Sequence, residues 1–220
     1  MSTKNSKNYS NESVKEYYHS TGLYDSIIYK KNKTNQNLPK EEIIENLLLK
    51  NKKLSNKVTG TNKKIILSNK NYKSKIMVLG DMPSQKDIDN NELFSDDSGE
   101  LLTKMLGAIS IDSSQVYLAN IIPFYLTKEE GKNIKKYNSL LRKIVHEHIS
   151  AINPETILLL GSFALQTLFG EEYSIAKNRG QWLSYSAANN SINIIPSFHP
   201  TFLLKQPSQK KKSWEDLQEL

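Results

Sequence analysis

Four short apolar runs, each followed by a helical segment, constrain the fold of this 220-residue chain more than any other feature. The runs are KIMVLG at residues 75–80, QVYLANII at 115–122, TILLL at 156–160 and INIIP at 192–196. Continuous apolar runs of this length predict strands that are buried on both faces, with helices as crossovers between them. We therefore expect an α/β fold of three layers, α/β/α, around a central four-stranded parallel sheet.

Helical periodicity and composition divide the rest of the chain. The spacing of apolar residues predicts helices over residues 41–50, 98–109, 133–151, 162–169 and 208–219. The lysine-rich stretch 51–64 is predicted to be irregular. Residues 13–29 predict a short helix that begins at Ser13, with Glu16 at the spacing of a capping box. We expect a basic, partly disordered extension over 1–40 and an α/β domain over 41–220.

Positive charge is concentrated near the amino terminus. The chain has a net charge of +7, and residues 1–75 contain 16 lysines against 6 acids. A basic arm beside a near-neutral domain favours a polyanionic partner such as nucleic acid. A composition rich in lysine and asparagine throughout would give the same excess without any such partner.

Several classes of site are excluded by missing residues. The chain has no cysteine, so it has no disulfide, thiol nucleophile or cysteine-held cluster. Glycine-rich nucleotide motifs are missing, and the acidic stretch 89–97 lacks the glycine that a calcium loop needs. His146 and His148 are two apart on a predicted helix and cannot share a metal. No apolar run could span a membrane and the polar start is no secretory signal, so we expect a cytoplasmic protein that needs no metal or cofactor.

Polar residues follow three of the predicted strands. Asp81 lies in GDMPS at 80–84, Asn120 ends the second strand, and His199 lies in PSFHP at 196–200. Because the carboxyl ends of parallel strands meet at one edge, these three side chains are expected to converge on one cleft. Each has a structural alternative: a turn cap for Asp81, a loop-satisfying amide for Asn120, and a hydrogen-bonded structural imidazole for His199.

These segments resemble the uracil-DNA glycosylase superfamily, and most of all its family 4 branch as found in alphaproteobacteria. The resemblance covers most of the chain and rests on these segments: KEYYHSTGLYDSII, KIMVLGDMPS, ELFSDDSGELLTKMLGAI, VYLANIIPF, HEHISAINPETILLLG, KNRGQW and IIPSFHPTFLLKQPSQKKKSWEDL. The last segment is the most specific. The resemblance implies removal of uracil from DNA by a DNA-repair enzyme.

The resemblance also implies roles at the base. Asp81 matches the acid that directs the attacking water, and His199 matches the residue that donates to uracil O2. Phe94 matches the aromatic residue that stacks on the base, and Asn120 matches the residue that reads its edge. The backbone of GDMPS (Gly80, Met82, Pro83 and Ser84) would help to hold the base.

A second group of residues would contact DNA around the flipped base. Leu203 and Leu204 match the family's loop that enters the duplex, where an apolar wedge fills the vacated stack. Pro200, Thr201, Lys205 and Lys210 complete the predicted DNA-binding group, with Lys211 and Lys212 nearby. For Lys210, Lys211 and Lys212, a solvated helix face is an equal alternative.

The chain departs from the family pattern in three places. Family 4 enzymes usually hold an iron–sulfur cluster through four cysteines, but the matching segments here are KLSNKV at 53–58 and NSLLRK at 138–143. Packing of Leu140 and Leu141 would replace the cluster. The usual Gly-Glu-Ala-Pro-Gly is Gly-Asp-Met-Pro-Ser, which shortens the acid by one methylene. The arginine- and proline-rich loop after Asn120 is reduced to PFYLTKEEG.

We therefore expect a monomeric, monofunctional glycosylase that uses water and leaves an abasic site in DNA. Two alternatives stay open from the sequence. One is a homologue that binds uracil-containing or damaged DNA without turnover. The other is a different α/β enzyme that acts on a small nucleoside or nucleotide.

Overall fold

The computed structural model describes residues 40–187 and 190–220. The chain divides into two compact units, residues 1–43 and 44–220, and the fold described here is that of the second. The predicted helix over 13–29 lies outside the described residues. Within the described part of the chain, no helix is both long and apolar enough to cross a membrane.

Five strands form one sheet in the order β2-β1-β3-β5-β4. Their bounds are β1 Ile76–Gly80, β2 Tyr117–Asn120, β3 Thr156–Leu160, β4 Leu183–Ala187 and β5 Asn190–Ser197. Strands β2, β1, β3 and β5 are parallel, and β4 pairs antiparallel with β5 at the edge. The predicted four parallel strands are therefore present, but the count of four was wrong. The missed strand β4 reads LSYSA, and this alternation of apolar and polar residues is typical of a half-buried edge strand.

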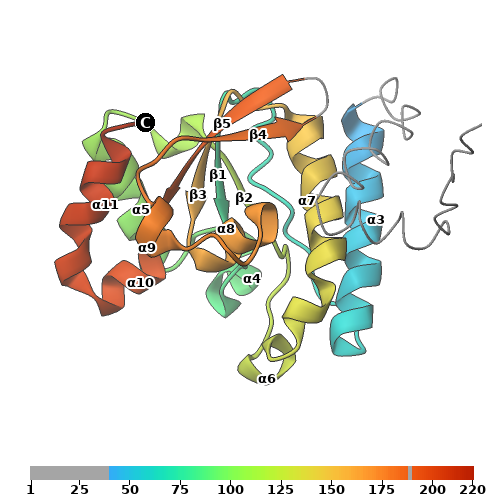
Figure 1. Ribbon diagram of the computed structural model, residues 1–220. Coiled ribbons are helices and arrows are strands. Elements are labelled where there is room, and N and C mark those ends of the chain that lie inside the picture. The colour runs from blue at the N-terminus through green and yellow to red at the C-terminus, as the bar shows by residue number, and fades with distance from the viewer. Residues whose placement is uncertain (1–39, 188–189) are drawn as a thin grey trace, which may run out of the picture. The chain divides into compact units, whose positions relative to one another are not determined.

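Helices cover both faces of this sheet (Figure 1). On one face, α5 and α11 bury Leu102, Leu106 and Leu217 against Val78 and Ile195 of the sheet. The other face carries α7 and α8, with α3 next to α7 (Figure 1). The helices have these bounds: α3 Lys40–Thr59, α4 Gln85–Asn90, α5 Asp97–Ala108, α6 Lys128–Gly131, α7 Asn138–Ile152, α8 Ser162–Phe169, α9 Ile175–Asn178, α10 Pro200–Lys205 and α11 Lys210–Leu217. The predicted three-layer α/β/α arrangement is confirmed.

Two predicted helices differ in extent. Helix α3 continues through the stretch predicted to be irregular, because Leu47, Leu54 and Ser55 keep one buried face in register and the helix ends only before Gly60, which has a φ of +73°. The predicted helix 133–151 is divided into a 3-10 turn at Ile134–Tyr137 and α7. Similarly, a 3-10 turn at Pro207–Gln209 precedes α11.

Candidate active site

The parallel strands bring the polar residues at their ends to one edge of the sheet. Gly80, the last residue of β1, pairs in register with Asn120, the last residue of β2. The ladder continues past the strands, because the amide of Ile121 donates to the carbonyl of Gly80 at 2.9 Å and that of Ile122 donates to the carbonyl of Asp81 at 2.9 Å. The backbone on both sides of the site is therefore fixed before any side chain is considered.

Three side chains meet above Gly80. A Cβ atom at this position would lie 2.5 Å from Asn120 Oδ1, 3.0 Å from Phe94 Cζ and 3.4 Å from His199 Nε2. Only glycine leaves room for this convergence. The rings of Phe94 and His199 are stacked, with centroids 6.3 Å apart and an interplanar angle of 27°.

The third polar residue lies beside the neighbouring glycine. A Cβ atom at Gly161, which follows β3, would lie 3.2 Å from each carboxylate oxygen of Asp81 and 3.2 Å from the Cβ of His199. The structure thus brings Asp81, Asn120 and His199 together, as expected from the strand order. The amide of Ala164 in the first turn of α8 donates to Asp81 Oδ1 at 3.1 Å and holds this carboxyl group in place.

His199 presents a neutral imidazole to the site. Its Nδ1 accepts a hydrogen bond from the amide of Thr201 at 3.2 Å, which caps α10 and leaves the ring proton on Nε2. Burial lowers the pKa of His199 to about 4, although the carboxylates of Asp96 and Asp87 act in the opposite direction. Nε2 is buried and has no partner among the described residues. It is therefore a hydrogen-bond donor without an acceptor.

Asn120 offers the complementary group. The side chain is 2% exposed, and its Oδ1 is buried with no hydrogen-bond partner in the described part of the chain. An unsatisfied buried acceptor costs roughly 1–3 kcal/mol. A second unsatisfied atom at the same place, His199 Nε2, makes this a region where polar groups are kept unpaired, which is typical of a binding site.

Asp81 has an altered acidity. Burial raises the pKa of its carboxyl group to about 7, and the hydrogen bond from the Ala164 amide only partly offsets this. Near neutral pH both the carboxylate and the carboxylic acid are populated, so this group can accept a proton from water.

The loop between β1 and α5 is fixed by Asp87. Its carboxylate accepts from the amides of Ser84 at 2.9 Å and Ser95 at 2.7 Å, and from the Ser95 hydroxyl at 3.0 Å. Phe94, next to Ser95, has a φ of +56°, an unusual conformation for a bulky residue. Its carbonyl lies over Gly99, where a Cβ would be only 1.6 Å from that oxygen. The position of Phe94 over the site therefore depends on Asp87 and Gly99, neither of which was identified from sequence.

Ser84 caps the start of α4 in this structure. The amide donates to Asp87, and its hydroxyl accepts from the Asp87 amide at 3.2 Å in a capping box at the start of α4. The Ser84 amide, which was expected to help hold the base, is therefore engaged in this cap. Met82 is exposed and Pro83 is buried beside it.

The two leucines of the predicted wedge face in different directions. Leu203 is 1% exposed and Leu204 is 42% exposed. Successive residues of a helix point about 100° apart, so α10 buries Leu203 near α5 and α11 while Leu204 faces outward. Of these two leucines, only Leu204 therefore presents its side chain at the surface, and entry of Leu203 into DNA stays a prediction. Phe202, 41% exposed and not identified from sequence, is the other large apolar side chain on the outer face of α10.

Charged and small residues around α10 complete this region. Pro200 is buried at the first position of the helix, and Thr201, Lys205 and Lys210 are exposed, as are Lys211 and Lys212.

Arg179 supports the segment that carries His199. Its guanidinium forms an ion pair with Asp216 of α11 at 2.8 Å and lies over the Phe198 ring, 5.5 Å from its centroid. The hydroxyl of Ser197 donates to Asp216 at 2.6 Å, and these contacts join β5 to α11. The motif KNRGQW is part of the family resemblance, but only the structure shows that its arginine packs on Phe198, next to His199.

A model of the uracil DNA glycosylase superfamily matches residues 68–218, which include every strand and the polar residues described above. The chain belongs to this superfamily.

Three relatives of this member of the uracil DNA glycosylase superfamily are all named type-4 uracil-DNA glycosylase. Proteins named type-4 uracil-DNA glycosylase are 24% identical over 154 residues in Archaeoglobus fulgidus and 27% identical over 151 residues in Thermotoga maritima. The matches cover 68% and 66% of this chain, and 77% and 74% of the relatives. A third, from Sulfurisphaera tokodaii, is 27% identical over 67% of this chain and 69% of its own length. The names of these three relatives agree with the superfamily match.

The residues present do not fit the iron–sulfur cluster that the family 4 resemblance implies. The chain has no cysteine, and the described residues include no group of three or more potential metal ligands. In the matching segments, Leu54 and Leu141 are buried instead, and the Tyr137 hydroxyl donates to the carbonyl of Lys57 at 3.0 Å. Leu140, which was expected to share this packing, is 36% exposed. At the segments where the cluster ligands would be, the chain is therefore held by ordinary side-chain packing and a hydrogen bond.

Proposed function

We propose that this protein hydrolyses the N-glycosidic bond of uracil in DNA and leaves an abasic site. The observation that carries the proposal is the pair of unpartnered buried atoms, the acceptor Asn120 Oδ1 and the donor His199 Nε2, beside a carboxyl group with a raised pKa. Uracil presents a matching pattern, with N3–H as donor and O2 and O4 as acceptors. The membership of the superfamily and the names of the relatives agree with it.

Base recognition follows from this pattern. Oδ1 of Asn120 accepts from uracil N3–H, and its amide nitrogen donates to O4. Cytosine has no proton at N3 and carries an amino group in place of O4. Oδ1 of Asn120 would then face another acceptor, N3, and its amide nitrogen would face another donor, the amino group. Phe94 stacks on the base. Since Phe94 lies close to Asn120 and His199 in the free protein, the base enters by displacing this half-buried ring.

The chemical step uses His199 and Asp81. As the bond from C1′ of the sugar to N1 of uracil breaks, its electron pair passes to the base, and His199 Nε2–H donates to the charge that develops on O2. The Asp81 carboxylate stabilises the positive charge on the sugar and takes a proton from the attacking water, whose oxygen forms the new bond to C1′. The uracil anion takes up a proton from solvent and Asp81 releases the one it accepted, so uracil and an abasic site are the products. No strand break or amine nucleophile is involved.

DNA contacts are proposed for the outer face of α10. The target nucleotide must leave the base stack, at a cost of a few kcal/mol. Leu204 and Phe202 are the exposed apolar side chains that can enter the vacated space, and Lys205 and Lys210 are placed to contact phosphates. We propose that one copy of the chain performs the reaction.

Incubation with a uracil-containing oligonucleotide followed by alkali tests this function. Strand scission that appears only after alkali, and not with matched thymine or cytosine oligonucleotides, is the expected result. Binding of the uracil strand without scission would instead assign a protein that reads uracil in DNA without turnover. Failure to bind any DNA at low salt would favour a small nucleoside or nucleotide as substrate.

A further inference from the structure

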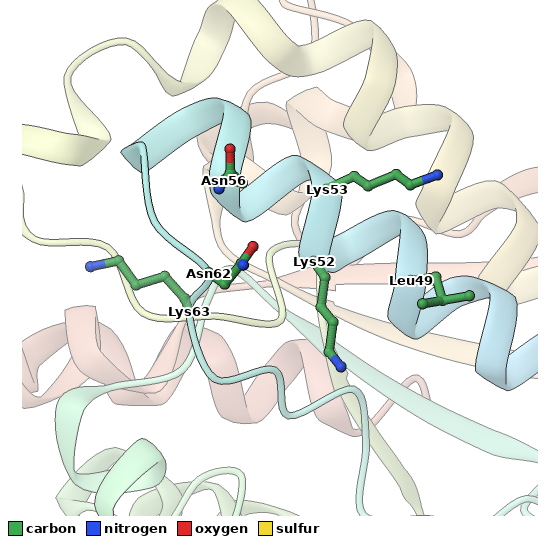
Figure 2. A pocket seen from close by; sticks show the side chains of 6 residues that line it. All are labelled: Leu49, Lys52, Lys53, Asn56, Asn62 and Lys63. Carbon is green, nitrogen blue, oxygen red and sulfur yellow. The ribbon is translucent and has the colours of Figure 1, made fainter.

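A lysine-rich hollow lies on α3, away from the predicted base pocket. Its volume is about 460 Å³, and it is lined by Leu49, Lys52, Lys53, Asn56, Asn62 and Lys63 (Figure 2). We call these six residues the α3 hollow. Nothing in the glycosylase chemistry described above uses it.

The α3 hollow follows from the helical period. Leu49, Lys52, Lys53 and Asn56 are spaced at i, i+3, i+4 and i+7, so they form one stripe of the helix. The opposite stripe holds the buried Leu47 and Leu54 and packs into the protein. The stripe with Leu49, Lys52, Lys53 and Asn56 therefore faces outward.

The charged residues at positions 50–64 of the sequence are all lysines, six in number. Two of them pair with carboxylates from elsewhere in the chain, Lys50 with Glu147 and Lys63 with Glu130 at 2.7 Å. Among the described residues, neither Lys52 nor Lys53 has a carboxylate within ion-pair distance. Two exposed ammonium groups therefore remain available for an anion from outside.

The α3 hollow is connected to the candidate active site by a short segment. The amide of Ile66 donates to the carbonyl of Pro123 at 2.8 Å, three residues after Asn120. The ammonium group of Lys64 donates to the carbonyl of Ile88 at 2.7 Å in α4, next to Asp87. One run of chain thus leads from the α3 hollow to both loops that flank the base pocket.

We propose that the α3 hollow binds backbone phosphates of the DNA strand that carries the uracil, beyond the nucleotide that enters the pocket. This rests on the proposed function and adds to it a second contact with substrate. Lys52 and Lys53 supply the charge, and the amides of Asn56 and Asn62 supply hydrogen-bond donors to phosphate oxygens. Such contacts increase affinity without reading sequence, and they need a strand long enough to reach α3.

A pair of charge-matched variants tests the proposal. Lys52→Glu with Lys53→Glu reverses the charge at the α3 hollow. Lys73→Glu with Lys75→Glu makes the same net change just before β1, at the opposite edge of the sheet, and also removes the exposed ion pair of Lys75 with Glu155. All four side chains are exposed, and thermal unfolding checks that both variants fold. Binding and excision are measured on uracil strands of about 5 and about 25 nucleotides, which lie near the lower end of and beyond the roughly 4–16 nucleotides that one single-strand-binding domain covers.

The wild type should bind the long strand more tightly than the short one. The Lys52/Lys53 variant should lose this advantage and show a salt dependence shallower by roughly one unit in log K against log salt, while excision from the short strand is unchanged. The Lys73/Lys75 variant should behave as the wild type does. Equal losses in both variants, or none in either, would overturn the proposal. If neither the wild type nor the variants excise uracil, the proposed function fails. The difference in binding of the long strand between the wild type and the Lys52/Lys53 variant still decides whether the α3 hollow contacts DNA.

Discussion

The proposed reaction depends on the protonation states of the Asp81 carboxyl group and the His199 imidazole. Burial at the carboxyl edge of the sheet shifts the pKa values of both Asp81 and His199. It raises the pKa of the carboxyl group toward neutrality and lowers the pKa of the imidazole away from it. The carboxyl group gains a pKa of about 7 and the imidazole stays neutral. One residue is thus able to exchange a proton near pH 7, while the other acts only as a donor.

Activity should follow the ionisation of Asp81. Only the carboxylate stabilises the sugar cation and accepts a proton, so kcat/KM should rise about tenfold per pH unit below the pKa of about 7 and level off above it. A pH–rate profile of the wild type measures this. A profile that is flat from about pH 5 to pH 9 would remove Asp81 from the catalytic step.

Asp81→Asn gives a second readout that does not depend on turnover. Between its ordinary pKa and about 7, the folded protein keeps a proton that the unfolded chain releases, so stability falls as pH rises through this range. The asparagine variant should lose activity and also lose this decline, so that it unfolds at a higher temperature than the wild type at pH 8. Thermal melts at pH 5 and pH 8 compare the two proteins.

Asn120→Asp should weaken discrimination between uracil and cytosine. A carboxylate can accept from N3–H but cannot donate to O4, so half of the recognition pattern is lost. The ratio of kcat/KM for uracil and cytosine strands is the measurement. An unchanged ratio would place Asn120 outside the base pocket.

His199→Ala should reduce kcat by roughly 10²–10³, the usual loss for one donor to a developing oxyanion. The loss should appear in single-turnover experiments, because it affects the chemical step rather than binding. A variant with wild-type turnover would show that the unpartnered Nε2 has another use.

In helix α10, two adjacent leucines have different surroundings: Leu203 is buried in the core and Leu204 is exposed at the surface. Leu204→Ala should reduce excision from duplex DNA more than from single strands, because only the duplex requires the vacated stack to be filled, and it should hardly change stability. Leu203→Ala is the matched control: it removes a buried side chain and should cost about 2–5 kcal/mol of folding free energy. Urea unfolding and excision assays on both variants should give opposite patterns.

The loop that carries Phe94 shows how elements place a side chain that no local pattern predicts. The carboxylate of Asp87 holds the amides of Ser84 and Ser95, and Gly99 makes room for the Phe94 carbonyl. The sequence excludes a calcium loop at residues 89–97 and gives Asp87 no role. The use of Asp87 as a cap depends on distances that form when α4 and α5 are in place.

For the whole molecule, the absence of cysteine predicts independence from iron. Chelators and ferricyanide should leave both the melting temperature and excision unchanged, because buried Leu54 and Leu141 occupy the segments that would hold cluster ligands. Metal analysis of the purified protein checks this directly. Stoichiometric iron, or destabilisation by a chelator, would contradict it.

By itself, the sequence determined the order of strands and helices, because apolar periodicity reports local structure and parallel strands with right-handed crossovers share one carboxyl edge. It also placed Asp81, Asn120 and His199 at that edge. Only the tertiary structure decided which of Leu203 and Leu204 faces outward, that β4 adds an edge strand, that Asp87 fixes Phe94, and that α3 carries a basic hollow. Apolar patterns do not specify these outcomes, because Leu203 and β4 are placed by packing against other elements and the contacts of Asp87 form only once α4 and α5 are in place.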